Sequence, residues 1–74
     1  MFDLQALETE LSKYGTILQC EVYHETNLEI KVKNATGRLA TYDRIETELI
    51  LPYFNKIESR FGGGFYKAAF YKIE

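Results

Sequence analysis

The pattern of apolar positions in the first fifteen residues predicts an amphipathic helix. Leu4, Leu7 and Leu11 recur at intervals of three and four residues, which places them on one face of a helix. Asp3 stands where an N-cap side chain accepts a backbone hydrogen bond, and Gly15 stands where a C′ glycine ends a helix. We therefore expect one helix whose leucines pack into a core.

The next stretch changes to a period of two residues, which is typical of strands. Residues 16–25 alternate, residues 24–27 form a polar break, residues 28–33 alternate again, and residues 34–37 give a second turn signal. This pattern predicts a β-hairpin with one face toward the helices and the other toward water. The expected inner residues are Leu18, Cys20, Val22, Leu28, Ile30 and Val32. The expected outer residues are Ile17, Gln19, Glu21, Tyr23, Glu29, Lys31 and Lys33.

The following residues allow two interpretations. Residues 38–42 form either a short strand or the approach to a second helix. Asp43 and Glu46 fit a capping box, with Asp43 as the N-cap, and apolar residues at helical spacing continue to Phe61. Pro52 lies within this pattern, where it either kinks one long helix or begins another helix at its first turn.

The chain closes with a glycine triplet at 62–64 and a strand over residues 65–73. We expect Gly62 to end the second helix and the triplet to reverse the chain. The strand has two faces to choose between, and burying the face that carries Lys67 would bury a lysine. We therefore expect Tyr66, Ala68 and Phe70 to point inward. The outer residues would then be Phe65, Lys67, Ala69, Tyr71 and Ile73.

Together these elements predict an α+β fold in one small domain, residues 1–74, with the order α-β-β-(β)-α-β. Two helices would pack on one face of an antiparallel sheet. A right-handed crossover through the second helix would return the last strand beside the first. The expected strand order is then 2-1-3, with residues 16–25 in the centre and the last strand at an edge.

Composition and charge limit the classes of function. The apolar fraction of 46% supports one core, and the net charge of −2 lacks the basic surface of a typical nucleic-acid binder. Residues 1–30 hold six acidic residues against one lysine, whereas residues 31–74 hold eight basic residues against five acidic ones. Such asymmetry can steer a partner or favour head-to-tail self-association, and the two halves can also simply neutralise each other across the fold. The sequence shows no signal peptide and no apolar run of membrane-spanning length, so we expect a cytoplasmic protein without a membrane partner.

The residue types needed for catalysis or metal binding are scarce. Cys20 and His24 would lie roughly 13 Å apart along one strand, too far to share an ion or a proton. Ser12 and Ser59 are expected inside helices, and Glu46 and Glu48 at the solvated surface. We therefore predict no catalytic, cofactor-binding or metal-binding residues, no cofactor, no small-molecule substrate and no enzymatic activity.

Two nucleotide-related motifs fail on the glycine triplet and the strand that follows it. The triplet precedes a strand, and Lys67 is not followed by Ser or Thr, so the phosphate-loop pattern is absent. Residues 60–70 bear a slight resemblance to the aromatic strand of RNA-recognition motifs. Lys67, however, falls where that family requires a second stacking aromatic residue. Nothing is carried over from either family.

The remaining candidate is the outer face of the sheet, where aromatic side chains lie among charged ones, as in protein-binding patches. We expect a non-enzymatic protein-interaction module. It would be a small inhibitor or adaptor of phage or mobile-element type, binding a protein partner or itself as a homodimer through the outer sheet face or an edge strand. The alternative is a module that binds single-stranded nucleic acid. It would stack bases on the exposed aromatic residues Tyr23, Phe65 and Tyr71 beside the lysines Lys31, Lys33 and Lys67. The predicted partner-binding residues are Tyr23, Lys31, Phe65, Lys67, Tyr71 and Ile73.

Overall fold

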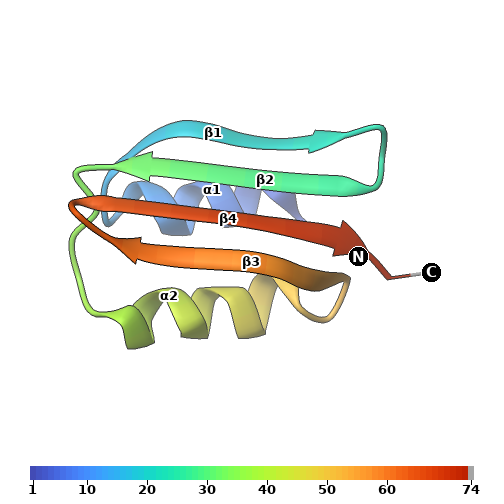
Figure 1. The fold of residues 1–74 in the computed structure, drawn as a ribbon. Helices are drawn as coiled ribbons and strands as arrows, with labels where there is room; N and C mark the ends of the chain where they lie inside the picture. The colour runs from blue at the N-terminus through green and yellow to red at the C-terminus, as the bar shows by residue number, and fades with distance from the viewer. Residues whose placement is uncertain (74) are drawn as a thin grey trace.

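A computed structural model describes residues 1–73 as two helices and a four-stranded antiparallel sheet (Figure 1). The α+β class, the antiparallel sheet and the two helices are confirmed, and the order along the chain is α-β-β-α-β-β. The elements are α1 (Leu4–Ser12), β1 (Thr16–Tyr23), β2 (Asn27–Lys33), α2 (Leu39–Ile45), the π-helical turn η1 (Glu46–Ile50), β3 (Phe54–Gly62) and β4 (Phe65–Lys72).

Helix α1 begins as predicted but ends differently. The Asp3 carboxylate accepts a hydrogen bond from the Ala6 backbone N–H at 3.0 Å, as an N-cap does. The helix ends at Ser12 with Lys13 as its C-cap, so the assignment of Gly15 as the C′ residue is wrong. Gly15 serves a close approach instead, because a Cβ there would lie 2.6 Å from the nearer Val32 methyl carbon.

The first hairpin has the predicted strands, with one exception in the facing of β1. A bulge lies between Ile17 and Gln19 and leaves Leu18 49% exposed. Ile17 then pairs with Val32 and packs against the core, so the predicted orientations of Ile17 and Leu18 are both wrong. The extra residue of a bulge reverses which face the side chains before it point to. A prediction that assumes strict alternation therefore assigns these side chains to the wrong face.

The second helix is shorter than predicted and begins earlier. It starts at Leu39 after Arg38 at the N-cap position, so residues 38–42 form no strand and Asp43 is not the N-cap. The π turn inserts one extra residue, and therefore Ile50 rather than Leu49 follows Ile45 into the core.

Residues 54–62 form strand β3, although the apolar spacing predicted a helix. Pro52 neither kinks nor begins a helix, because it lies in the turn between η1 and β3. A second bulge lies between Lys56 and Glu58, and it interrupts the alternation that would have identified the strand. Ser59 is consequently a strand residue.

The glycine triplet forms a hairpin turn and does not end a helix. Gly62 pairs with Phe65, which leaves Gly63 and Gly64 as a two-residue loop with φ of 60° and 79°. Positive φ at both positions is the requirement of the type I′ turn, whose twist matches that of the two strands.

The strand order is β1-β2-β4-β3, so the predicted order 2-1-3 is wrong. Strand β1 is an edge rather than the centre, and β4 lies between β2 and β3 (Figure 1). The last strand is therefore not an edge strand. The reason is that β3, which was read as helix, supplies a second hairpin that lies beside the first.

The topology repeats itself. Residues 4–33 and residues 39–72 each run as a helix followed by an antiparallel hairpin, and the inner strands β2 and β4 pair antiparallel. An approximate two-fold axis normal to the sheet, near the pair Ile30 and Ala68, exchanges the two halves. The same axis also relates the two bulges. They lie at Leu18 and at Ile57, each five residues before the end of its edge strand.

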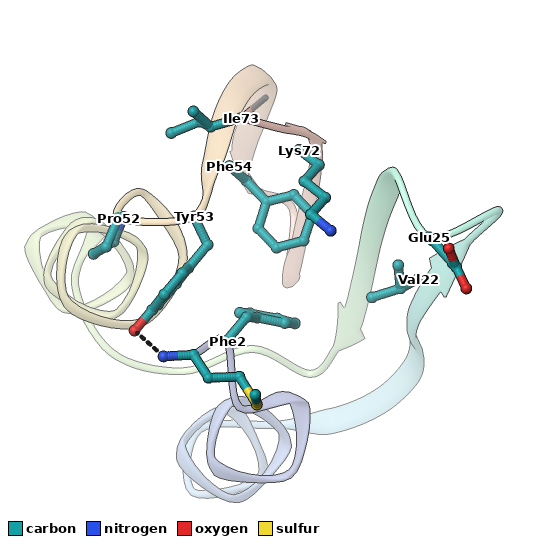
Figure 2. A pocket seen from close by; sticks show the side chains of 9 residues that line it. Phe2, Val22, Glu25, Pro52, Tyr53, Phe54, Lys72 and Ile73 are labelled. Atoms are coloured by element: carbon teal, nitrogen blue, oxygen red, sulfur yellow. Dashed lines mark hydrogen bonds between the residues drawn. The ribbon is translucent and has the colours of Figure 1, made fainter.

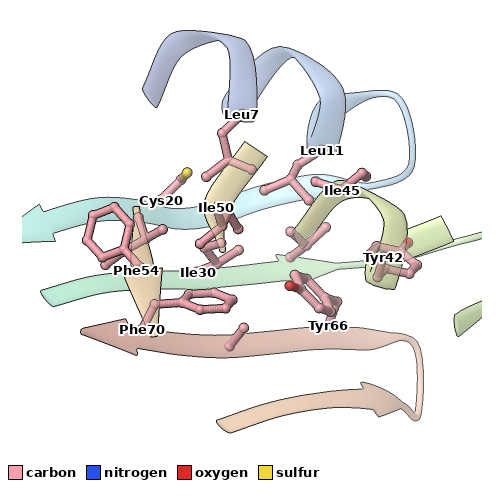
Figure 3. Close-up of a cluster of buried hydrophobic side chains, with 13 residues drawn as sticks. Leu7, Leu11, Cys20, Ile30, Tyr42, Ile45, Ile50, Phe54, Tyr66 and Phe70 are labelled. Carbon is pink, nitrogen blue, oxygen red and sulfur yellow. The ribbon is translucent and has the colours of Figure 1, made fainter. Parts of the chain in front are cut away.

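The core lies between the helices and one face of the sheet (Figure 3). Tyr42 of α2 stacks on Tyr66 of β4, with ring centroids 4.7 Å apart, and also contacts Phe61 of β3. Within residues 1–73, neither helix is long and apolar enough to cross a membrane. The buried apolar residues are Leu7, Leu11, Cys20, Leu28, Ile30, Val32, Tyr42, Ile45, Ile50, Phe54, Tyr66, Ala68 and Phe70.

Candidate functional site

The face of the sheet that points away from the helices is the surface on which most of the predicted residues meet. The choice of faces for β4 is confirmed, because Tyr66, Ala68 and Phe70 are buried. The side chains of Phe65 and Tyr71 are 42% and 46% exposed. We call this surface the outer face. Its residues are Gln19, Glu21 and Tyr23 of β1, Asn27, Glu29, Lys31 and Lys33 of β2, Phe65, Lys67, Ala69 and Tyr71 of β4, and Asn55, Glu58 and Arg60 of β3.

The register of the strands arranges the charges of the outer face in rows that run across the sheet. Lys31 of β2 pairs with Lys67 of β4, which pairs with Arg60 of β3. We call these three residues the basic row. Like charges directly opposite one another on neighbouring strands are destabilising, so this arrangement is unfavourable within the sheet alone.

The next row toward the hairpin turn at residues 24–26 carries the opposite charge. Glu21 of β1 pairs with Glu29 of β2, and Glu58 of β3 lies in the same row beyond Ala69. We call Glu21, Glu29 and Glu58 the acidic row. The approximate two-fold axis of the fold relates the two rows, so Lys67 is equivalent to Glu29 and Arg60 to Glu21, whereas Lys31 is equivalent to Ala69 and Glu58 to Gln19.

Aromatic side chains lie at the two ends of the rows. Phe65 pairs with Lys33 beyond the basic row, and Tyr71 pairs with Asn27 beyond the acidic row. Tyr23 continues the second of these end rows and accepts a hydrogen bond from the Gln19 side chain at 2.6 Å. The carboxylate of Glu21 beside it raises the pKa of the Tyr23 phenol, which stays protonated.

The charges of the outer face have no ion-pair partners among residues 1–73. The ion pairs of this part of the chain are Lys13–Glu10, Arg44–Glu48 and Lys56–Glu46, and none of them lies on the outer face. Seven charged side chains of both signs are therefore available to a partner. Those seven are Glu21, Glu29, Lys31, Lys33, Glu58, Arg60 and Lys67.

Five of the six predicted partner-binding residues lie on the outer face, and Ile73 does not. Ile73 follows the end of β4, where its backbone N–H donates to the Tyr53 carbonyl at 3.0 Å. Its side chain borders a separate pocket (Figure 2). The sequence analysis also missed Arg60 and Glu58, because it placed them in a helix.

The pocket beside Ile73 has a volume of about 710 Å³. Phe2 forms one wall and contacts Phe54 edge to face, with ring centroids 4.8 Å apart. The N-terminal amine donates to the Tyr53 hydroxyl at 3.1 Å, and Lys72 points into the same region (Figure 2). The lining comes from widely separated segments, so no local pattern in the sequence predicts it. The pocket is mainly apolar, and its charged lining residues are of both signs, since Glu25 lies there with Lys72 and the N-terminal amine.

A buried polar cluster joins η1 to the second hairpin. Glu46 is 1% exposed, so the expectation that it is a solvated surface residue is wrong. The hydroxyls of Ser59 and Tyr66 each donate to Glu46 Oε2 at 2.7 Å, and Lys56 Nζ lies 2.8 Å from Glu46 Oε1. Burial raises the pKa of Tyr66, and the hydrogen bond to Glu46 raises the pKa of Lys56, so both donors keep their protons near neutral pH. The cluster therefore stabilises the packing of η1 against β3 and β4.

Cys20 and His24 lie where the sequence predicted. Cys20 is buried, and its burial raises the pKa of the thiol to about 12. His24 is exposed in the hairpin turn with a φ of 52°. Within residues 1–73, no three His, Cys, Asp or Glu side chains gather closely enough to hold a metal ion.

Comparison of the chain with protein-family models, with curated proteins and with solved structures finds no match.

Proposed function

We propose that this chain is a non-enzymatic protein-interaction module that binds a protein partner through the outer face. One observation carries the proposal. Phe65 and Tyr71 are exposed on an inner strand, and the charged side chains around them have no ion-pair partners among residues 1–73. Aromatic side chains at such positions, with charges around them, supply most of the binding energy in protein interfaces.

The finer assignment within this proposal is a small inhibitor or adaptor of phage or mobile-element type in the cytoplasm. It rests on the small size of the folded unit formed by residues 1–73 and on the lack of a converging set of acid, base and nucleophile among these residues. The neighbouring genes would test it, since defence genes and replication genes point to different partners.

The experiment is a quantitative pull-down with immobilised wild-type protein and the variants Phe65→Ser and Tyr71→Ser. Each variant removes an aromatic anchor and is expected to reduce partner capture by roughly tenfold or more. The matched control is Leu39→Ser, which removes an exposed apolar side chain from α2, outside the outer face. Far-UV circular dichroism checks that each variant is folded. Equal capture by wild type and both aromatic variants would reject the proposal.

A second candidate is binding of single-stranded nucleic acid, favoured by the basic row and by Phe65 and Lys33 beside it. A backbone could follow the cations while a base stacks on Phe65. The test is fluorescence anisotropy of a labelled oligonucleotide across a salt series, with Lys67→Glu as the variant. This function requires binding that weakens with salt and a salt slope reduced in the variant. The absence of binding at low salt would exclude it.

A further inference from the structure

The sequence of rows along the strands makes the outer face complementary to itself. From one end to the other, the rows are Phe65 with Lys33, the basic row, the acidic row, and Tyr71 with Asn27. Successive rows are two residues apart, or about 7 Å along a strand. If a second copy faces the first with this order reversed, the basic row lies over the acidic row of the second copy. The row of Phe65 and Lys33 then lies over the row of Tyr71 and Asn27.

We propose that the partner of the outer face is the outer face of a second copy of this chain, in a two-fold symmetric dimer. This inference rests on the proposed function and names the partner. The axis lies between the two sheets and runs across the strands, midway between the basic and acidic rows.

The charges select this axis. A two-fold axis parallel to the strands would place the basic row of one copy on the basic row of the other. The axis across the strands reverses the row order but keeps each strand over its own counterpart. Lys31 then lies over Glu29 of the second copy, and Arg60 lies over Glu58 of the second copy. Each contact occurs twice, as two-fold symmetry requires.

The aromatic side chains meet under the same operation. Phe65 and Tyr71 lie on β4 at equal distances on either side of the axis. The axis therefore brings Phe65 over Tyr71 of the second copy, again twice. The strands of the two copies run antiparallel across the interface, which is compatible with aligned packing of two sheets about 10 Å apart.

The dimer also accounts for the unfavourable arrangement of charges within one sheet. Lys31 stands opposite Lys67, and Glu21 stands opposite Glu29, so each copy holds like charges on neighbouring strands. A second copy places Glu29 over Lys31 and Glu58 over Arg60, whereas Lys67 lies over Ala69 and Glu21 over Gln19. Four strands about 4.8 Å apart and four rows about 7 Å apart give an interface at the lower end of the specific range, so we expect a dissociation constant in the micromolar range.

The test is sedimentation equilibrium of the full chain from micromolar to millimolar concentration. The wild type is expected to shift from monomer to dimer, and added salt should weaken the dimer. Lys31→Glu and Glu29→Lys each place like charges against each other at two symmetric contacts and should weaken the dimer by about tenfold or more. The double variant Lys31→Glu/Glu29→Lys exchanges the two charges and should restore wild-type association to within about threefold.

The matched control is Glu8→Lys, which makes the same charge change at an exposed position of α1 and should leave association unchanged. Circular dichroism and thermal unfolding check the fold of every variant. A wild type that stays monomeric at millimolar concentration would overturn the inference, as would a double variant no better than the single ones. If the wild type is monomeric but captures another protein in a Phe65-dependent way, the self-association fails and the proposed function stands.

Discussion

A carboxylate removed from water needs a cation and hydrogen-bond donors, and Glu46 has both. Lys56 approaches one carboxylate oxygen, while Ser59 and Tyr66 donate to the other. The four residues come from η1, β3 and β4, so the cluster fixes the π turn against the second hairpin. These directional contacts favour a single packing of the second half of the chain.

Replacing Glu46 with Ala should destabilise the fold by about 2–4 kcal/mol, because it leaves two hydroxyls without an acceptor and opens a cavity. Urea unfolding followed by circular dichroism measures the change. Glu48→Ala is the control, since Glu48 is exposed two residues away, and it should change the free energy of unfolding by less than about 0.5 kcal/mol. Equal effects of the two substitutions would contradict a structural role for the cluster.

At the scale of elements, the turn between β3 and β4 decides the position of every residue in the second hairpin. Gly63 and Gly64 both have positive φ, which allows a two-residue turn and fixes Gly62 opposite Phe65. That register places Lys67 opposite Lys31 and Tyr71 opposite Asn27 after β4 joins β2. The two glycines at the border of the outer face therefore determine which of its residues lie opposite one another.

Gly63→Ala should destabilise the fold by about 1–2 kcal/mol, because an L side chain is strained at a φ of 60°. Gly62→Ala is the matched control, since Gly62 does not have positive φ and an added Cβ would meet no atom within 4 Å. Gly63→Asn should keep the stability near that of the wild type, because Asn-Gly is a preferred type I′ pair. Thermal and urea unfolding of the three variants check these results. A Gly62→Ala variant as unstable as Gly63→Ala would argue against a type I′ turn.

The sequence predicted the elements with regular periods and missed those with an interruption. Helix α1, strand β2 and the facing of β4 have uninterrupted patterns, and the structure confirms them. Strand β1 was predicted as a strand, but its bulge at Leu18 made the predicted orientations of Ile17 and Leu18 wrong. The bulge at Ile57 conceals the period of β3, while Ile45, Leu49 and Tyr53 happen to continue a helical spacing. Arg60 and Glu58 were missing from the predicted outer face for the same reason, because they were assigned to a helix. The cluster around Glu46 depends on tertiary contacts that no local pattern contains.

At the scale of the whole molecule, the fold consists of two similar α-β-β units joined by residues 34–38. The sequence shows no repeat, because the two units fill equivalent positions with different residues, as Ile30 and Ala68 illustrate. Both ends of the described chain contact Tyr53, through the Met1 amine and through the backbone N–H of Ile73. Figure 1 shows the N-terminus and the C-terminal end of β4 at the same end of the sheet.

These features predict that a circular permutant will fold. A chain that starts at Arg38, continues through a short Gly/Ser linker into Met1 and ends at Gly37 would keep the order α-β-β-α-β-β. Its amide NMR spectrum and circular dichroism should resemble those of the wild type. A control permutant opened at Lys67, within the inner strand β4, should not fold. A disordered Arg38 permutant would show that the connection between the two halves is needed for folding.

The bulges at Leu18 and Ile57 limit how far association of this chain can proceed. Each interrupts the regular backbone of an edge strand, so a further strand cannot be added in continuous register on either side of the sheet. Growth by edge pairing into ribbons or fibrils is therefore discouraged at both ends. In the proposed dimer, contact through the outer face occupies the one extended sheet surface of residues 1–73, and we expect assembly to stop at a closed pair even at high concentration.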